Sequence, residues 1–181
     1  MNSTLILLAL AAIWPPLSAD KHPRQNLAPN VASPQLIVDR MLEAASVKPD
    51  ETVYDLGCGE GRIVITAAQK FHAKAVGVEI SAGLVRSATE MVHKLGLENR
   101  VSVVRGDIMD VDVSPADVVT LYLLTGSNTM LRPRLEKLLK PGARVVSHDY
   151  EVRGWKPSRV EQVNVHRRVH KIYVYQMPPG K

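Results

Sequence analysis

Apolar positions along this chain fall into two patterns that alternate with each other. Short and nearly continuous apolar runs, the pattern of strands, occupy residues 52–56, 73–80, 101–105, 117–124 and 143–149. Segments whose apolar residues recur three or four positions apart, as on one face of a helix, occupy residues 34–45, 61–71, 81–95 and 131–139. Continuous apolar strands are typical of a parallel sheet that helices cover on both faces. The pattern therefore predicts an α/β, doubly wound fold.

The C-terminal part of the chain has a different pattern. Residues 159–166 and 168–177 alternate apolar and polar positions with a period of two, and no helix-length segment separates them. Alternation of this kind is typical of antiparallel strands with one face in solvent. We expect these two segments to form an antiparallel hairpin at the edge of the sheet.

Two helix ends carry specific signals. Ser33 followed by Pro34 predicts an N-cap and a first helical position, because a serine hydroxyl can accept from a free helix N–H and proline lacks one. Gly96 comes directly after the apolar stripe of residues 81–95. Glycine in that place predicts that the helix ends in a left-handed residue.

The first thirty residues form a separate region. Residues 5–13 are a continuous apolar run, whose length is nearer to the hydrophobic part of a signal peptide than to a membrane span. Residues 1–4 contain no Lys or Arg, whereas Lys21 and Arg24 follow the run. The positive-inside rule would hold a domain that follows such charges on the cytoplasmic side of a membrane.

These features divide the chain into three parts. We expect residues 1–19 to be an N-terminal hydrophobic targeting or anchor segment, residues 20–32 a linker and residues 33–181 the folded domain. The expected location is a membrane, with the domain on its cytoplasmic side. Export after signal-peptide cleavage is the alternative.

Composition agrees with one folded domain. The chain has 181 residues, of which 45% are hydrophobic and 23% charged, as in soluble globular proteins. Its one cysteine, Cys58, excludes an intrachain disulfide and a cysteine-cluster metal site. The formal charge of +5 equals the excess in residues 151–181, which hold seven Lys and Arg against two Glu. Such a basic segment can face nucleic acid, a membrane or an acidic protein, or can protect an edge hairpin from aggregation.

Three glycines follow the first predicted strand at alternate positions, namely Gly57, Gly59 and Gly61. Glycine lets the backbone turn sharply and approach a ligand closely, and open α/β sheets bind ligands at this place. A dinucleotide fingerprint would require a glycine at the position of Arg62. NAD is therefore not expected.

Acidic residues stand at the carboxyl ends of three successive predicted strands: Asp55, Glu79 and Asp107. Carboxylates can accept hydrogen bonds from a ribose diol, an amino group and an adenine amine. A carboxylate in the glycine loop would repel a pyrophosphate. These residues therefore predict a site for a neutral or cationic nucleoside.

The stretches "YDLGCGEG", "AVGVEI" and "RGDI" resemble the successive cofactor motifs of class I S-adenosylmethionine-dependent methyltransferases, and "LKPGARVVSHDY" resembles their fifth strand and its lead-in. The resemblance covers roughly residues 33–150. It implies a Rossmann-like, mainly parallel seven-stranded sheet with an antiparallel last strand, and S-adenosyl-L-methionine as the cofactor. By position it also implies the cofactor-binding residues. Gly57, Gly59 and Gly61 would admit the cofactor, with Asp55 near its methionine end. Glu79 would take the ribose hydroxyls, with Ile80 next to it in the sequence, and Asp107 and Ile108 the adenine.

A narrower group is similar to this chain in "ASPQLIVDRML", "YDLGCGEGRIVI", "VVTLYLL" and "RVVSHDYEVRGWKP". It comprises the small methyltransferases related to the mitochondrial ATP-synthase c-subunit lysine methyltransferases. That similarity implies a protein lysine as the methyl acceptor. Relatives usually have an aromatic residue near Pro29 and a proline near Thr125, and this chain has neither.

Methyl transfer from a sulfonium is an in-line displacement, which needs positioning and exclusion of water rather than a metal or an acid–base triad. A lysine acceptor must first lose a proton, against an ordinary pKa of ~10.4. The candidates lie after the fourth and fifth strands. We expect Asp149, and His148 after it, to act in catalysis, and Tyr122, Asn128 and Trp155 to bind the acceptor.

These candidates have simpler structural interpretations. His148 and Tyr122 could be core residues, and Trp155 could cap the edge of the sheet. The histidines show no metal-ligand spacing along the sequence, so no metal site is expected.

Three classes of function remain open. The first is a protein-lysine methyltransferase attached to a membrane, and the second is a methyltransferase for RNA or a small molecule, which the basic segment motivates. The third is a non-catalytic module that binds the nucleoside. Base-amine methyltransferases of this fold usually carry an Asn/Asp-Pro-Pro-aromatic motif after the fourth strand, and "LYLLTGSN" lacks it. Its absence argues against a base amine as the acceptor, though not against a ribose or a small molecule. We expect a protein partner more than nucleic acid.

Overall fold

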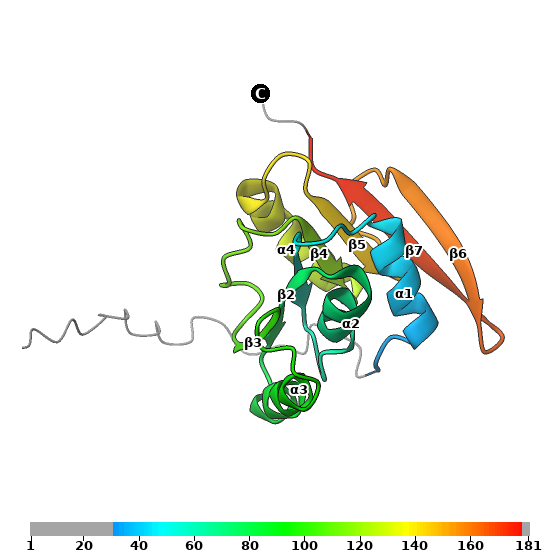
Figure 1. Cartoon of the computed structure of the whole chain (residues 1–181). Helices are drawn as coiled ribbons and strands as arrows, with labels where there is room; N and C mark the ends of the chain where they lie inside the picture. The colour runs from blue at the N-terminus through cyan, green and yellow to red at the C-terminus, as the bar shows by residue number, and fades with distance from the viewer. Residues whose placement is uncertain (1–30, 179–181) are drawn as a thin grey trace, which may run out of the picture.

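A twisted seven-stranded sheet lies at the centre of the structure, a computed structural model that describes residues 31–178 (Figure 1). The strands are β1 (Thr52–Leu56), β2 (Lys74–Glu79), β3 (Val101–Arg105), β4 (Val118–Leu121), β5 (Arg144–His148), β6 (Arg159–Val165) and β7 (Arg168–Gln176). Their order in the sheet is β3-β2-β1-β4-β5-β7-β6. Strands β1 to β5 are parallel, and β7 is antiparallel to both β5 and β6. The predicted fold class and the C-terminal hairpin are confirmed.

Helices cover both faces of this sheet. They are α1 (Gln35–Ala44), α2 (Arg62–Phe71), α3 (Ala82–Lys94) and α4 (Thr125–Leu138). Helices α1, α2 and α3 contribute to one buried hydrophobic cluster, whereas α4 and the segment after β3 belong to the second. Two clusters separated by the sheet are what a doubly wound fold requires.

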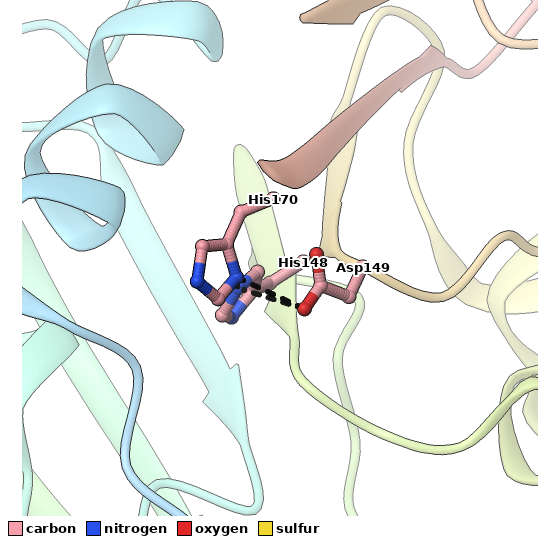
Figure 2. Close-up of side chains that lie close together, drawn as sticks. All are labelled: His148, Asp149 and His170. Carbon is pink, nitrogen blue, oxygen red and sulfur yellow. Dashed lines mark hydrogen bonds and ion pairs between the residues drawn. The ribbon is translucent and has the colours of Figure 1, made fainter. Parts of the chain in front are cut away.

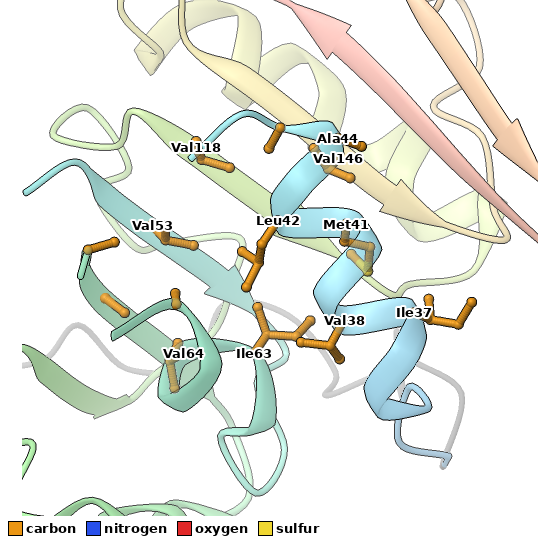
Figure 3. Close-up of a cluster of buried hydrophobic side chains, with 14 of the residues drawn as sticks. Ile37, Val38, Met41, Leu42, Ala44, Val53, Ile63, Val64, Val118 and Val146 are labelled. Carbon is orange, nitrogen blue, oxygen red and sulfur yellow. The ribbon is translucent and has the colours of Figure 1, made fainter. Parts of the chain in front are cut away.

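The first cluster explains why α1 forms where it does. Its residues Ile37, Val38, Met41 and Leu42 are fully buried, and Figure 3 shows their side chains between α2 and strands β1, β4 and β5. Burying one such side chain contributes about 1.5–3 kcal/mol. This packing fixes α1 beside α2 and over strands β5, β7 and β6, directly after residues 31–33.

Helix α4 begins earlier than the apolar pattern predicts. The prediction for residues 131–139 missed the first turn, because residues 125–128 are polar or glycine. Ser127 and Asn128 are nevertheless buried, and Asn128 finds hydrogen-bond partners on the loop after β5. Strand β4 also ends at Leu121 rather than at residue 124. Tyr122 therefore lies just beyond the end of β4 and is not part of the sheet.

The predicted cap at Ser33 was wrong. The N-cap of α1 is Pro34, and no side chain caps this end. The Ser33 hydroxyl instead lies 2.8 Å from Nδ1 of His148, which is 115 positions away in the chain. Gly96 does end α3 in the left-handed conformation, with a φ of 65°, as predicted.

The sheet topology determines where a ligand can bind. Strand order runs outward in one direction through β2 and β3 and in the other through β4 and β5, so the switch point lies between β1 and β4. Open α/β sheets bind ligands beyond the carboxyl ends of the strands at this point. Asp55 of β1 is paired with Thr120 of β4 there.

The N-terminal segments predicted from sequence are mostly outside the described residues. Residues 1–19 lie wholly outside them, and so do most of residues 20–32. Among the helices of residues 31–178, none has the length and apolar character to cross a membrane.

Candidate active site

The glycine loop after β1 presents bare backbone toward the switch point. Gly57, Gly59 and Gly61 all have left-handed φ angles, of 85°, 56° and 82°. A Cβ atom added to Gly59 would meet no atom within 4 Å, so the loop leaves open space on this side. Residues with side chains rarely adopt this backbone conformation. The glycines thus allow both the turn and the close approach of a ligand.

Cys58 holds the loop against β2. Its side chain is buried, and a Cβ atom on Gly77 would lie only 2.6 Å from its sulfur. Burial raises the pKa of the Cys58 thiol, and the nearby Asp55 and Glu79 raise it further. The residue is therefore a small packing group and not a reactive thiolate.

Asp55 is a buried carboxylate with few partners. Its side chain lies at the end of β1 and is 3% exposed, and Thr120 Oγ1 donates to its Oδ1 at 2.8 Å. No Lys or Arg among residues 31–178 forms an ion pair with it. Burial raises the pKa of Asp55 to about 7, and the charge of Glu79 acts in the same direction. An uncompensated buried carboxylate is a site for a cationic group.

Glu79 and Asp107 are the other two carboxylates at this edge of the sheet. The Glu79 carboxylate accepts from the backbone N–H of Gly59 at 3.0 Å and of Ser81 at 2.9 Å. Asp107 Oδ1 accepts from Met109 N–H at 2.8 Å, at the start of the segment after β3. Each carboxylate is thereby held in a fixed orientation and keeps lone pairs for a ligand's donors.

The two apolar residues predicted beside these acids differ in exposure. Ile80, directly after Glu79, is 39% exposed, whereas Ile108 is buried against the second cluster. Both lie at the edge where the resemblance would put the nucleoside.

A strap formed by residues 31–33 covers one side of the glycine loop. A cavity of about 80 Å³ lies beneath it, lined by Ser33, Asp55, Gly57 and Tyr122, among others. Arg62 Nη1 donates to the Ser33 carbonyl oxygen at 2.9 Å, and His148 holds the Ser33 hydroxyl. The start of the domain is thus tied to both sides of the site.

Tyr122, His148 and Asp149 come together beside this cavity. Tyr122 lines the cavity and is half-buried, and its ring stacks on that of His148 with centroids 4.0 Å apart. Burial raises the pKa of Tyr122, as does the charge of Asp149. His148 is fully buried, and burial lowers its pKa to about 4, against the opposing charge of Asp149. The imidazole is therefore neutral at pH 7.

The Asp149 carboxylate is already engaged by residues at the start of β7. Oδ1 accepts from the backbone N–H of Lys171 at 2.9 Å. Oδ2 lies 3.0 Å from both Arg168 Nη2 and His170 Nδ1. Figure 2 shows this oxygen directed toward the two imidazole rings of His148 and His170. Asp149 itself has a left-handed φ of 59°, which aspartate tolerates better than most residues.

Asn128 and Trp155 take structural positions. Asn128 Nδ2 donates to the carbonyl oxygens of Tyr150 and Glu151, so it fixes the loop after β5. Its buried Oδ1 has no hydrogen-bond partner in residues 31–178. Trp155 packs on Tyr175, and Tyr175 pairs near the start of β5. Trp155 is therefore not brought together with Tyr122 and Asp149, and its placement favours the cap at the sheet edge.

Sequence reasoning missed three residues of this site: Ser33, Arg168 and His170. Ser33 was interpreted as a cap, and Arg168 and His170 as parts of a solvated hairpin. No local motif marks them, because the antiparallel pairing of β5 with β7 brings residues 22 positions apart into contact. The period-two pattern predicted the hairpin, but the pairing of β7 with β5 beside the site is seen only in the structure.

The hydrogen-bond acceptors of this site fit S-adenosyl-L-methionine. Asp55 offers an uncompensated buried carboxylate to the methionine amino group, Glu79 offers acceptors to a ribose diol, and Asp107 offers one to an adenine amine. The open space at Gly59 would be filled by any side chain there. A bound cofactor would supply an electrophilic methyl group on a sulfonium.

Comparisons with known proteins identify relatives of this chain. The family model of the ANTKMT methyltransferase domain matches residues 55–159. A protein-lysine N-methyltransferase of Saccharolobus islandicus is 52% identical over 148 residues, which are 81% of this chain and 92% of that protein. The adenine nucleotide translocase lysine N-methyltransferase of Mus musculus is 31% identical, with 84% of this chain and 68% of that protein covered.

A solved structure is also similar. The crystal structure of an RNA methyltransferase from Salinibacter ruber, in complex with S-adenosyl-L-homocysteine, is 42% identical with a TM-score of 0.77. The likeness covers 83% of this chain and 96% of that one. The motifs, the glycine loop with its three carboxylates and these relatives lead to one conclusion: the chain belongs to the ANTKMT methyltransferase family and is an S-adenosyl-L-methionine-dependent methyltransferase.

Proposed function

We propose that this enzyme methylates the ε-amine of lysine residues in a protein substrate. The observation that carries the proposal is the acidic and aromatic environment beside the cofactor cavity, made by Tyr122, Tyr150 and Asp149. The names of the relatives from Saccharolobus islandicus and Mus musculus support lysine as the acceptor.

The two tyrosines suit the shape and charge of a lysine side chain. Their ring centroids are 6.1 Å apart and the rings are tilted by 33°, and both side chains are half-buried. Aromatic faces pack against the aliphatic part of lysine and attract its ammonium group. Tyr122 also lines the cavity at Asp55 and Gly57, so an amine that passes it reaches the methionine end of the cofactor site.

Asp149 and His148 have the catalytic roles in this proposal. The negative charge of Asp149 acts at Tyr122, so it attracts a lysine ammonium to the same place. The amine must release its proton before it can attack, and a partly dry pocket favours the neutral form. His148 holds the Tyr122 ring by stacking and anchors Ser33 through Nδ1, which keeps this wall of the pocket closed to water.

A labelled-cofactor experiment tests the acceptor. The purified full-length chain is incubated with labelled S-adenosyl-L-methionine and either a protein extract or total RNA. We expect label in protein that resists nuclease, and mass spectrometry should place it on lysine. A Glu79→Ala variant is the matched control without cofactor binding. Label confined to RNA or to small molecules would overturn the lysine assignment.

RNA is the second candidate, because the 42% identical structure from Salinibacter ruber is of an RNA methyltransferase and residues 151–181 are basic. The described part of that basic segment forms the β6–β7 hairpin at the sheet edge. Its arginines are partly paired with acids of the chain itself, such as Arg159 with Glu161 and Arg168 with Asp149. This pairing favours the protein substrate.

We also propose that residues 1–19 hold the enzyme at the cytoplasmic side of a membrane. The support is the apolar run of residues 5–13 followed by Lys21 and Arg24. Fractionation of cells expressing the full chain should recover it with membranes. A cleaved product found only outside the cytoplasm would contradict this location.

A further inference from the structure

Three metal-ligating atoms meet at the junction of β5 and β7. They are Nε2 of His148, Nδ1 of His170 and Oδ2 of Asp149 (Figure 2). The two nitrogens lie 2.9 Å apart, and the oxygen lies 3.0 Å from His170 Nδ1 and 3.4 Å from His148 Nε2. We infer that this triangle is a binding site for a divalent transition-metal cation of the zinc class.

The size of the triangle fits one face of a tetrahedral ion. Zinc bound to imidazole nitrogen and carboxylate oxygen at ~2.0–2.2 Å has ligand atoms roughly 3.3 Å apart. The three observed separations, 2.9, 3.0 and 3.4 Å, lie around that value. A linear chain of hydrogen bonds would not require all three atoms to be mutually close.

Within the triangle itself, a single ring proton is available to the three atoms. When Nδ1 of His148 carries the ring proton and donates to Ser33 Oγ, its Nε2 presents a lone pair to the triangle. A carboxylate also offers only lone pairs. At most one proton, on His170 Nδ1, then lies within the triangle, between the lone pairs of His148 Nε2 and Asp149 Oδ2, and Oδ2 also accepts a hydrogen bond from Arg168. A cation in its place would satisfy all three and release that proton.

The groups around the triangle already orient the ligands. Ser33 Oγ holds the far nitrogen of His148, and the backbone N–H of Lys171 holds Oδ1 of Asp149. Metal-binding histidines and carboxylates are typically held by such outer hydrogen bonds. The two imidazoles are buried, with His148 0% and His170 5% exposed. The ligands are therefore held in place, and three of them leave one tetrahedral position for water. A bound dication would outweigh the charge of Asp149, so the attraction of a lysine ammonium proposed above belongs to the metal-free form.

Among residues 31–178, Arg168 is the Lys or Arg that forms an ion pair with Asp149 and would compete with a metal ion. Its Nη2 lies 3.0 Å from the same Oδ2, but its side chain is 62% exposed and can move into solvent. A carboxylate oxygen also has a lone pair for each partner. Removing Arg168 should therefore strengthen metal binding.

Sequence spacing could not reveal this site. His148 and Asp149 are adjacent, but His170 follows 22 positions later on another strand. The expectation of no metal site was based on spacing along the chain alone, and the β5–β7 pairing is what assembles the ligands.

Metal titration of the full-length chain tests the inference. After chelation and dialysis, we expect calorimetry to show one saturable Zn²⁺ site per chain, and Co²⁺ to give the visible absorption of a tetrahedral site. His170→Gln and Asp149→Asn should each weaken binding at least tenfold, and asparagine keeps the left-handed backbone at position 149. Arg168→Ala should bind more tightly. His93→Ala, which removes an exposed histidine of α3, is the matched control and should bind like the unmodified chain.

Two outcomes would overturn the site. One is the absence of saturable Zn²⁺ binding by the unmodified chain. The other is unchanged affinity in both His170→Gln and Asp149→Asn while circular dichroism shows them folded, because the ion would then lie elsewhere. Having two ligand variants keeps the test valid if one of them fails to fold.

Discussion

Asp55 and Asp149 are two acidic residues at the same edge of the same sheet, in opposite electrostatic states. Asp55 at the end of β1 is buried, accepts one hydrogen bond from Thr120 and has no cationic partner among the described residues. Asp149, after β5, has the Arg168 guanidinium, His170 and a backbone N–H of β7 around it. The first carboxylate is uncompensated in the free protein, whereas the second is compensated by the protein itself.

We infer from this difference that Asp55 serves cofactor binding and Asp149 serves binding of the methyl acceptor. A buried charge without a partner destabilises the free protein and is relieved when a cationic ligand arrives. If Asp55 binds the methionine amino group, as its position implies, the free energy that it costs the free protein is recovered as cofactor affinity. Asp149 destabilises the folded protein little, because its carboxylate is paired. The part of its negative charge that is not compensated acts at Tyr122, where we propose that the acceptor lysine binds.

The largest effect is expected from Asp55→Asn. Loss of the charged partner should weaken S-adenosyl-L-methionine binding by roughly 10- to 100-fold, because a hydrogen bond between charged groups contributes about 1.5–3 kcal/mol. The same change should raise the melting temperature of the free protein at pH 8, since it removes an uncompensated buried charge. Calorimetry and thermal melts check both effects. Asp112→Asn, at an exposed site, is the control, and cofactor affinity equal to the control's would remove Asp55 from the site.

A pH series sharpens the same contrast. The pKa of Asp55 is raised by burial from 3.8 to about 7 in the folded protein. Its protonation therefore stabilises the fold fully below pH 3.8, and this contribution is lost as pH rises through about 7. Its size is on the order of a few kcal/mol. Cofactor affinity should change in the opposite sense and increase as pH rises through about 7, because the ligand's ammonium needs the ionised carboxylate.

The measurement for that series is the melting temperature of the free chain between pH 4 and 8, with Asp55→Asn alongside. The variant should lose the decline that the unmodified chain shows toward pH 7. Parallel curves for the two proteins would show that another group controls the pH dependence.

Asp149→Asn should have a smaller and different effect. We expect turnover to fall by roughly tenfold, the scale of one charge-assisted hydrogen bond, while cofactor affinity stays unchanged. Steady-state kinetics with a lysine-containing protein and calorimetry with the cofactor separate the two quantities. Full activity in a folded Asp149→Asn protein would exclude a chemical role for this residue.

The smallest effect is expected from Ser33→Ala. It removes the hydrogen bond to His148 and should reduce the free energy of unfolding by about 1 kcal/mol. Chemical denaturation measures this difference, with Ser114→Ala at an exposed turn as the control. A loss no larger than the control's would mean that the strap is held by Arg62 and packing alone.

The residues around Asp55 could be predicted from the sequence, whereas the partners of Asp149 could not. Asp55, the three glycines and Glu79 lie in short motifs whose chemistry is local, so their residue types and spacing indicate a nucleoside site directly. The partners of Asp149 come from β7, and only the pairing of β5 with β7 makes them neighbours. Ser33 shows the same limit, because a helix cap and a long-range partner of His148 have the same appearance in sequence.

The polar start of α4 was missed for a related reason. Residues 125–128 have the composition of a loop, and their helical form depends on a buried Asn128 that bonds to the chain after β5. Apolar periodicity reports which residues face the core. It does not report polar groups that are buried with partners.

The position of β7 in the sheet has a consequence for how the chain is made. The strand synthesised last of the seven lies between β5 and β6, not at the margin. Until residue 176 has left the ribosome, β5 has an unpaired side, and the core lacks Ile172 and Tyr175. A nascent or truncated chain that stops before β7 therefore exposes an open strand, which can pair with other proteins and favours aggregation.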